Sequence, residues 1–379
     1  MNKSLVLFGG SFDPPHIGHG EIVRAIFAEL SPDLLIVMPT GTPPHKAQNE
    51  FVPAGDRMEM AKLAFGDFDN VLVSDYEIKK SEPCFTIDTV KRLKNQYPGH
   101  DITVVIGSDE ANVFDSWKDF SEILSLAKVA VFHRKGEEVN SDARFIYLSA
   151  DISEVSSTDI RQLFQTGNFD KAQEFLTKEV YDYIERSGLY FLNLSEKRLV
   201  HSRNVADMSA QLARAYGADE RLAFKAGLYH DIEKEQDFEK MLQNVEKWVL
   251  TSGKSRDIIQ TVEYWRYFPK VLHAFAGAEE IYAKCFHLVD NSDDAVLAIC
   301  FHTSGCADMS LLQKIVFIAD AVEVGRRYDG ADEMRQIAFM DIDRAVALVL
   351  KRTLSRLRKY NIKIFPLTQE AYSFYKIYE

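Results

Sequence analysis

The spacing of apolar residues changes near residue 195, and a chain that switches pattern in this way is expected to fold as two differently built parts. Before that point, short apolar runs alternate with amphipathic stretches, and the strands we expect are SLVLFG, LLIVMP, NVLVSD, DITVVIG and KVAVFHR. The stretches between them, such as HGEIVRAIFAEL and AGDRMEMAKLAF, have helical period. This alternation predicts βαβ units, and we expect an α/β doubly wound parallel sheet of Rossmann type over residues 1–193.

The rest of the chain has helical period almost throughout, as in EKRLVHSRNVADMSAQLARAYG, ERLAFKAGLYHDIEKE and SLLQKIVFIADAVEVG. Gly217 is the last residue of the first of these stretches, at a position typical of a helix stop. We therefore expect an all-α domain over residues 194–379, joined by a short linker within YFLNLSEK, residues 190–197. A length of 379 residues, too great for one ordinary core, agrees with two domains.

Composition excludes several classes of function. A formal net charge of −12 argues against a nucleic-acid surface, because phosphate backbones repel an acidic body. No apolar run reaches the roughly 18 residues of a membrane helix, and MNKSLVLFGG is expected to be a first strand rather than a signal peptide. The four cysteines form no C-x-x-C pair. We expect a cytoplasmic protein with reduced thiols, no nucleic-acid partner and no membrane association.

The stretch GGSFDPPHIGHGEI, residues 9–22, combines the end of a strand with the start of a helix. Gly9 and Gly10 lack a β-carbon, so backbone amides there can approach a phosphate closely. His16 and His19 are three positions apart, a spacing that places both on one helix face beside an amino-terminal dipole that favours anions. The stretch therefore predicts a phosphate site, against the alternative of two incidental surface histidines on a turn.

The same stretch resembles the H-x-G-H signature of adenylyl- and cytidylyltransferases. Further segments occur in the order and spacing of bacterial nicotinate-nucleotide adenylyltransferases, and the resemblance covers about residues 3–191: GTPPHK, FTIDT, GSDEANVFDSW, FHRKG and VSSTDIR. It implies that the phosphate of nicotinate mononucleotide attacks the α-phosphorus of ATP, giving nicotinate adenine dinucleotide and pyrophosphate. Such a transfer is mostly positioning and charge neutralisation.

The resemblance also implies roles for individual residues. His16 and His19 are expected to be catalytic and to hold the ATP phosphates, with His19 stabilising the departing pyrophosphate. Mg²⁺ is expected to arrive with ATP. The remaining ATP contacts implied are Gly9, Gly10, Ser11, Phe12, Asp109, Ser157, Thr158 and Arg161.

For the acceptor, the resemblance implies His45, Lys46, Thr86, Trp117 and Arg134. The two residues after the Pro43-Pro44 turn are suited to fix a cation beside the acceptor phosphate, and the tryptophan can stack on a pyridine ring. Plainer interpretations stay open: the tryptophan as core, Arg134 as a surface cation, and SSTDIR as a helix cap.

The later histidines form a second pattern, spread over several expected helices. Four imidazoles and two carboxylates suit a pair of transition-metal ions, iron or manganese especially. Adjacent His230 and Asp231 project about 100° apart on a helix, so both can face one site only with two metal positions or a bridging carboxylate. The candidate ligands are His201, His230, Asp231, His273, His302 and Asp320.

The order His, His-Asp, Asp resembles the HD-domain pattern of metal-dependent phosphohydrolases. With the additional His273 and His302, residues 196–375 resemble the bacterial YqeK-type proteins. That resemblance implies symmetrical hydrolysis of diadenosine tetraphosphate into two ADP by a two-metal site. It also implies that Asp231 bridges the metals and is catalytic with Lys234, and that the polyphosphate meets Arg326 and Arg327.

The sequence thus favours a bifunctional enzyme whose partners are ATP, nicotinate mononucleotide and diadenosine tetraphosphate. Two alternatives stay open. The front half could accept nicotinamide mononucleotide or another phosphorylated acceptor, while the HD half takes another nucleotide or a cyclic dinucleotide. In the second alternative, the HD half is a nucleotide-sensing module that regulates the transferase. Whether the chain forms a homo-oligomer is left open as well.

Overall fold

The computed structural model describes residues 3–41, 52–80, 82–133, 142–149, 152–190, 192, 194–252 and 262–379. Among these residues, no helix combines the length and apolar character needed to span a bilayer. The chain divides into two compact units, Met1–Glu185 and Arg186–Glu379. The sequence analysis places the boundary slightly later, between residues 193 and 194.

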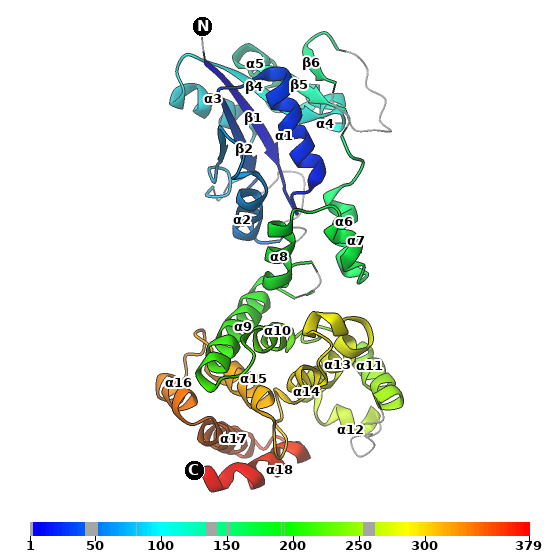
Figure 1. Ribbon diagram of the computed structural model, residues 1–379, viewed down its shortest axis with the longest axis vertical. Coiled ribbons are helices and arrows are strands. Elements are labelled where there is room, and N and C mark those ends of the chain that lie inside the picture. The colour runs from blue at the N-terminus through cyan, green and yellow to red at the C-terminus, as the bar shows by residue number, and fades with distance from the viewer. Residues whose placement is uncertain are drawn as a thin grey trace. The chain divides into compact units, whose positions relative to one another are not determined.

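The first unit is built on a parallel sheet of six strands in the order β3-β2-β1-β4-β5-β6 (Figure 1). The sequence analysis did not name the last of these strands. Their bounds are Lys3–Gly10 (β1), Leu34–Pro39 (β2), Val71–Val73 (β3), His100–Gly107 (β4), Lys128–Phe132 (β5) and Phe145–Leu148 (β6).

Helices cover both faces of this sheet, because its strands are apolar on both sides. Leu5 and Leu7 of β1 pack with α3 and α5 on one face, and Val6 and Phe8 pack with α1 and α2 on the other. The α/β doubly wound expectation is confirmed. The helical elements of this part are Ile17–Leu30 (α1), Ala54–Phe65 (α2), Thr86–Gln96 (α3), Ser108–Asn112 (α4), Phe114–Ser116 (η2), Phe120–Leu126 (α5), Ser157–Gln165 (α6), Phe169–Gln173 (α7) and Lys178–Ser187 (α8).

The central strands β1 and β4 mark the point where the strand order reverses. β2 and β3 extend the sheet from the β1 side, and β5 and β6 extend it from the β4 side. In open α/β sheets, ligands bind beyond the carboxyl ends of the strands at such a point. Here those ends are Gly10 and Gly107, and both belong to motifs that the sequence analysis assigns to ATP.

The second unit is helical throughout its described residues, as expected (Figure 1). Gly217 ends its first helix with a left-handed φ of 68°, in agreement with the predicted helix stop. Its elements are Glu196–Tyr216 (α9), Glu220–Tyr229 (α10), Phe238–Ser252 (α11), Val262–Arg266 (α12), Pro269–Lys284 (α13), Phe286–Val289 (η3), Asp293–Phe301 (α14), Leu311–Val322 (α15), Ala331–Met340 (α16), Ile342–Lys359 (α17), Pro366–Tyr375 (α18) and Lys376–Tyr378 (η4).

The helix expected over residues 220–235 is shorter than its apolar pattern indicates. α10 ends at Tyr229, His230 is its C-cap, and His230 and Asp231 lie in the turn that follows. His302 is likewise the C-cap of α14. These metal-ligand candidates therefore stand at helix ends, where a backbone turn can redirect neighbouring side chains.

Gly227 explains how α9 and α10 come so close together. A β-carbon added there would lie 2.7 Å from Oγ of Ser209 and 2.9 Å from Cα of Ala206, both on α9. Only glycine leaves room for this approach. The contact places His230, at the end of α10, beside His201 on α9, with ring centroids 5.3 Å apart.

Candidate functional site

The first candidate site lies at the carboxyl ends of β1 and β4. His16 is the N-cap of α1, and its backbone N–H donates to Nδ1 of His19 across 3.2 Å. The ring centroids of the two histidines are 3.9 Å apart. The structure thus brings together the two residues that the sequence analysis predicts to be catalytic, and both are half-buried.

The amino terminus of α6 docks on the same turn. Ser157 Oγ donates to the carbonyl of Pro14 at 2.8 Å, and Arg161 donates to the carbonyl of Asp13 at 2.7 Å. Arg161 also holds Thr158 Oγ1 at 3.0 Å. Ser157 and Arg161 therefore bond directly to the segment that carries the histidines, and Thr158 is linked to it through Arg161.

Ser156, one residue earlier, is the N-cap of α6 and forms a capping box with Asp159. The cap interpretation of SSTDIR is therefore correct. It does not compete with a ligand role, because a helix amino terminus also favours an anion.

Phe12 and Gly10 contribute through packing as well as through backbone. The Phe12 side chain is buried against the rings of Phe65 and His19, with a left-handed φ of 48°. A β-carbon at Gly10 would lie 3.1 Å from the Phe12 ring, whereas one at Gly9 would meet a single atom at 4.0 Å. Gly10 therefore leaves room for the Phe12 ring. Because that ring is buried in the core, any ligand contact of Phe12 is through its backbone.

Asp109 occupies the first turn of α4, directly beyond β4. A β-carbon on Gly107 would lie 2.3 Å from Asp109 Oδ1, so the glycine leaves the space that this carboxylate occupies. Asp109 is the second residue after β4, and Ser11 is the first residue after the neighbouring strand β1.

Two of the predicted acceptor residues lie near each other. Thr86 is the first residue of α3, and Trp117 packs against Phe114, with ring centroids 5.2 Å apart. Lys118, next to Trp117, stands 4.5 Å from the ring centroid of Phe85, next to Thr86. Trp117 is half-buried on the core, which agrees with the plainer core interpretation of that residue. The other acceptor candidates lie outside the described residues: His45, Lys46 and Arg134.

Sequence analysis missed Arg57, a buried arginine in the first turn of α2. Its guanidinium donates to the carbonyl of Ser11 at 2.9 Å and to the carbonyl of Gly41 at 3.2 Å. It therefore links the turn after β1 to the chain after β2. No local pattern marked this role, because its partners lie 46 and 16 residues away.

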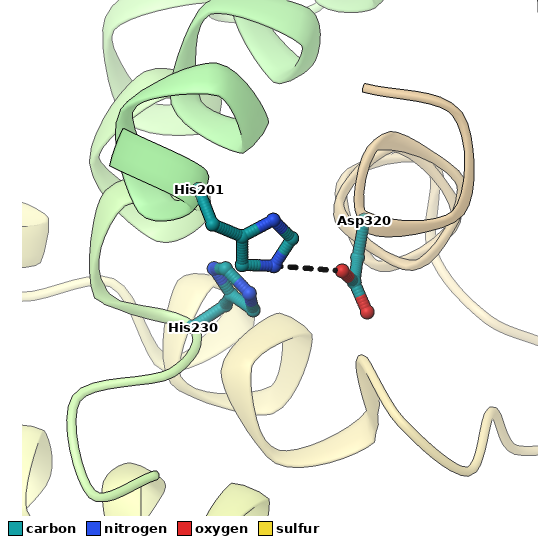
Figure 2. Close-up of side chains that lie close together, drawn as sticks. All are labelled: His201, His230 and Asp320. Carbon is teal, nitrogen blue, oxygen red and sulfur yellow. Dashed lines mark ion pairs between the residues drawn. The ribbon is translucent and has the colours of Figure 1, made fainter. Parts of the chain in front are cut away.

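The second candidate site gathers all six predicted metal ligands in the helical unit. His201, His230 and Asp320 form one group whose ligand atoms lie within 4.8 Å of one another. Figure 2 shows these side chains converging from α9, the end of α10 and α15, with His201 Nε2 3.1 Å from Asp320 Oδ1. His230, Asp231 and His302 form a second such group, so His230 belongs to both.

Asp231 stands between two pairs of histidines. Its Oδ1 lies 3.1 Å from Nε2 of His273 and 3.3 Å from Nε2 of His302. Its Oδ2 lies 3.6 Å from Nε2 of His230 and 3.9 Å from Nε2 of His201. Each carboxylate oxygen therefore faces a different pair of imidazoles, which is the geometry that a bridging ligand needs.

Three of the histidines are oriented through Nδ1. His230 Nδ1 lies 2.6 Å from the carbonyl of Gly227, and His302 Nδ1 lies 2.7 Å from that of Ile299. His201 Nδ1 instead faces Oε1 of buried Glu323 at 3.2 Å. With Nδ1 donating, each Nε2 presents a lone pair to the centre of the site.

The electrostatics of the cluster fit a divalent cation. Burial lowers the pKa of His230 and of His273 to about 4, so both imidazoles are neutral near pH 7. Burial alone raises the pKa of Asp231, but the neighbouring imidazoles, His230 first and then His273 and His302, outweigh it and hold the pKa well below its usual range. Within the described chain, Nε2 of His201, Nε2 of His230 and Oδ1 of Asp231 are buried and form no hydrogen bond. Neutral imidazoles and ionised carboxylates with unused lone pairs suit a transition metal.

Cationic side chains surround this cluster. Lys234 Nζ lies 2.8 Å from His273 Nε2 and 3.2 Å from Asp231 Oδ1, and Arg326 pairs with Asp320. Arg327, the other predicted polyphosphate contact, is exposed. Sequence analysis missed Arg198, whose Nη1 lies 3.2 Å from Asp231 Oδ2. Arg198 lies one helical turn before His201 and so shares a helix face with it, and this spacing could have identified it in the sequence.

Comparison with known proteins agrees with this division. Residues 7–163 match the cytidylyltransferase-like family model, and residues 198–325 match the HD domain model. The nicotinate-nucleotide adenylyltransferase of Bacillus subtilis is 32% identical over 189 residues, which cover 50% of this chain and 98% of that protein. A Mycoplasma genitalium protein named "Probable nicotinate-nucleotide adenylyltransferase/Ap4A hydrolase" is 28% identical over 366 residues, which cover 93% of this chain and 98% of that protein.

Proposed function

Because the chain belongs to the nicotinate-nucleotide adenylyltransferase family and also carries an HD domain, we propose that it is an enzyme with two separate activities. Residues 1–193 transfer an adenylyl group from ATP to nicotinate mononucleotide. Residues 194–379 hydrolyse diadenosine tetraphosphate into two ADP. The Mycoplasma relative, whose name joins the same two activities, supports the pairing.

In the transfer, a phosphate oxygen of the acceptor bonds to the α-phosphorus of ATP, and the bond from that phosphorus to pyrophosphate breaks. The observation that carries this proposal is the pair His16 and His19 at the strand-order reversal, with α6 docked on the same turn. The histidines hold the phosphates and stabilise charge on the departing pyrophosphate. Arg161 and the α6 amino terminus hold the nucleotide, and Mg²⁺ comes with ATP.

In the hydrolysis, a water oxygen bonds to a β-phosphorus, and the bond from that phosphorus to the oxygen joining the two halves breaks. The convergence of six ligand side chains carries this proposal. The six histidine and aspartate side chains of this cluster would hold divalent cations, iron or manganese, which would supply Lewis acidity and lower the pKa of a water. Lys234, Arg198 and Arg326 donate to the phosphate oxygens, and Lys234 protonates the leaving oxygen; the proximity of all three to the cluster supports these roles.

Separate incubations of the purified full-length protein test both activities. With ATP, we expect nicotinate mononucleotide to give the dinucleotide and pyrophosphate, and nicotinamide mononucleotide to be a poorer acceptor. With Mn²⁺ or Fe²⁺, we expect diadenosine tetraphosphate to give ADP alone. Chromatography identifies the products. Equal specificity constants for the two acceptors contradict the acceptor assignment, and AMP with ATP as products contradicts symmetrical cleavage.

A further inference from the structure

A pocket of about 640 Å³ opens at the β3 edge of the sheet, in the first unit. None of the residues assigned above to ATP or to the acceptor lines it. Exposed Leu72 and half-buried Met58 provide its accessible apolar surface, and Tyr76 and Tyr97 also line it. The lining residues Ile36, Met38 and Leu93 belong to the buried core beneath. Its volume falls within the range of small-molecule sites, about 300–1,000 Å³.

The charged side chains of this pocket are strongly unbalanced. Four cations line it, Lys62, Lys79, Lys80 and Arg92, together with one carboxylate, Asp75. In a chain of net charge −12, four cations around one pocket differ from the average composition of the chain, in which acidic residues outnumber basic ones. Lys79 pairs with Asp75 at 2.7 Å, and Lys62 pairs with a glutamate of its own helix.

The two remaining cations share one aromatic ring. The guanidinium carbon of Arg92 is 4.0 Å from the ring centroid of Tyr76, and Lys80 Nζ is 4.4 Å from the same centroid. In the part of the chain that the structure describes, neither of them forms an ion pair with a carboxylate. Both cations therefore lie within 4.4 Å of one ring centroid, and each carries a positive charge that an anion in the pocket can neutralise.

We propose that this pocket is a second nucleotide site of the first unit, which binds a mononucleotide through its phosphate. Lys80 and Arg92 take the phosphate, whereas Lys62 and Lys79 are already paired with carboxylates and contribute less. The base packs on the accessible apolar surface formed by Leu72 and Met58, with Tyr97 in the same lining. The net negative charge of the chain favours a free mononucleotide over a nucleic acid.

The elements around the pocket also reach the predicted acceptor residues. α3 carries Arg92 and begins at Thr86, and Thr89 on that helix donates to the Glu77 carboxyl at 2.7 Å. Glu77 belongs to the segment that lines the pocket, and its carbonyl oxygen would lie 2.3 Å from a β-carbon on Gly41. A ligand in the pocket therefore touches elements that hold the acceptor region. We expect it to change the KM for nicotinate mononucleotide, an expectation that rests on the proposed transferase function.

Equilibrium dialysis of the full-length chain with AMP tests the site. The variant K80Q/R92Q removes both cations, and K128Q/K171Q is a charge-matched control at exposed positions away from the pocket. We expect the first variant to bind one AMP fewer than the control, or to bind it about tenfold more weakly, with kcat of the transferase unchanged. Adenosine, which lacks the phosphate, is expected to bind weakly to all of these proteins.

Identical AMP isotherms for K80Q/R92Q and the control overturn the proposal, as does equal binding of adenosine. Absence of a second AMP class in the unaltered protein overturns it too. R92K, which keeps the charge but loses the planar guanidinium, is a milder variant, and we expect it to keep most of the binding. Dialysis measures binding without catalysis. Its result can therefore be interpreted even if the transferase assignment is wrong.

Discussion

The two candidate sites differ in how far the folded chain alone buries and orients their side chains. In the helical unit, His230, Asp231, His273 and His302 are at most 2% exposed, and their ligand atoms already face one another. In the first unit, His16 and His19 are half-buried on a turn. A resident metal needs its ligands oriented in advance, whereas a substrate that brings its own phosphates and Mg²⁺ can complete a site made of turns and helix amino termini.

The largest expected effect comes from a substitution that disrupts the metal site of the helical unit alone. Asp231→Ala removes the carboxylate whose two oxygens face separate pairs of histidines. We expect metal content to fall well below about two ions per chain, hydrolysis to fall to background and the helical unit to lose stability, while adenylyl transfer survives. Elemental analysis with both activity assays measures this. Asp207→Ala, an exposed position on α9, is the control, and two tightly held metal ions in Asp231→Ala rule out the two-metal assignment.

The reciprocal change breaks the first site alone. His19→Ala removes the ring that packs on His16, and we expect kcat for dinucleotide synthesis to fall by about 10²–10³-fold, as when one transition-state donor is lost. Hydrolysis of diadenosine tetraphosphate serves as the internal control and is expected to stay unchanged. Synthesis at the original rate excludes His19 from the chemistry.

A smaller effect tests how the helical site is oriented. Glu323 accepts from Nδ1 of His201 and from Nδ2 of Asn204, both at 3.2 Å. Glu323→Gln keeps the shape but loses the charge behind His201, and we expect metal binding to weaken about 10–100-fold. Metal titration in the absence of substrate measures this directly. Glu333→Gln, an exposed change on α16, is the control, and equal affinities for both variants exclude a positioning role.

The smallest effect concerns acid stability without metal. The pKa values of His230 and His273 fall from 6.5 in the unfolded chain to about 4 in the folded one, so the unfolded state binds more protons between these values. Stability of the metal-free helical unit is therefore full above pH 6.5 and declines as the pH falls toward 4, by on the order of 2–3 kcal/mol for each histidine. Asp231 and Asp320, whose pKa values are lowered in the folded chain, stay mostly ionised in both states down to about pH 5 and weaken folding only below that.

Urea unfolding at about pH 7 and about pH 5 measures this loss. Replacing His230 with Gln is expected to reduce the difference between the two pH values, because one titrating group is gone. A free energy of unfolding that stays constant from pH 7 to pH 5 contradicts buried, neutral histidines.

Much of both folds and most candidate residues could be read from the sequence, because they depend on local regularities. Strands buried on both faces are continuous apolar runs, as in Leu5–Phe8, and the amphipathic helix that begins at Glu196 has a clear stop at Gly217. The short strand Phe145–Leu148 went unnamed. Arg57 and Glu323 were also missed, since their partners lie up to 46 and 122 residues away. Nothing local marks such a contact.

The sequence by itself determined two units of different periodicity and the chemical types at each site, since spacing and side-chain chemistry are properties of short segments. Only the tertiary structure decided that α10 ends at Tyr229, so that His230 and Asp231 leave the helix together. It also decided which oxygen of Asp231 faces which histidines. The physical reason is that the positions of these atoms depend on how closely helices approach, as α9 and α10 do at Gly227, and packing between distant segments sets that distance.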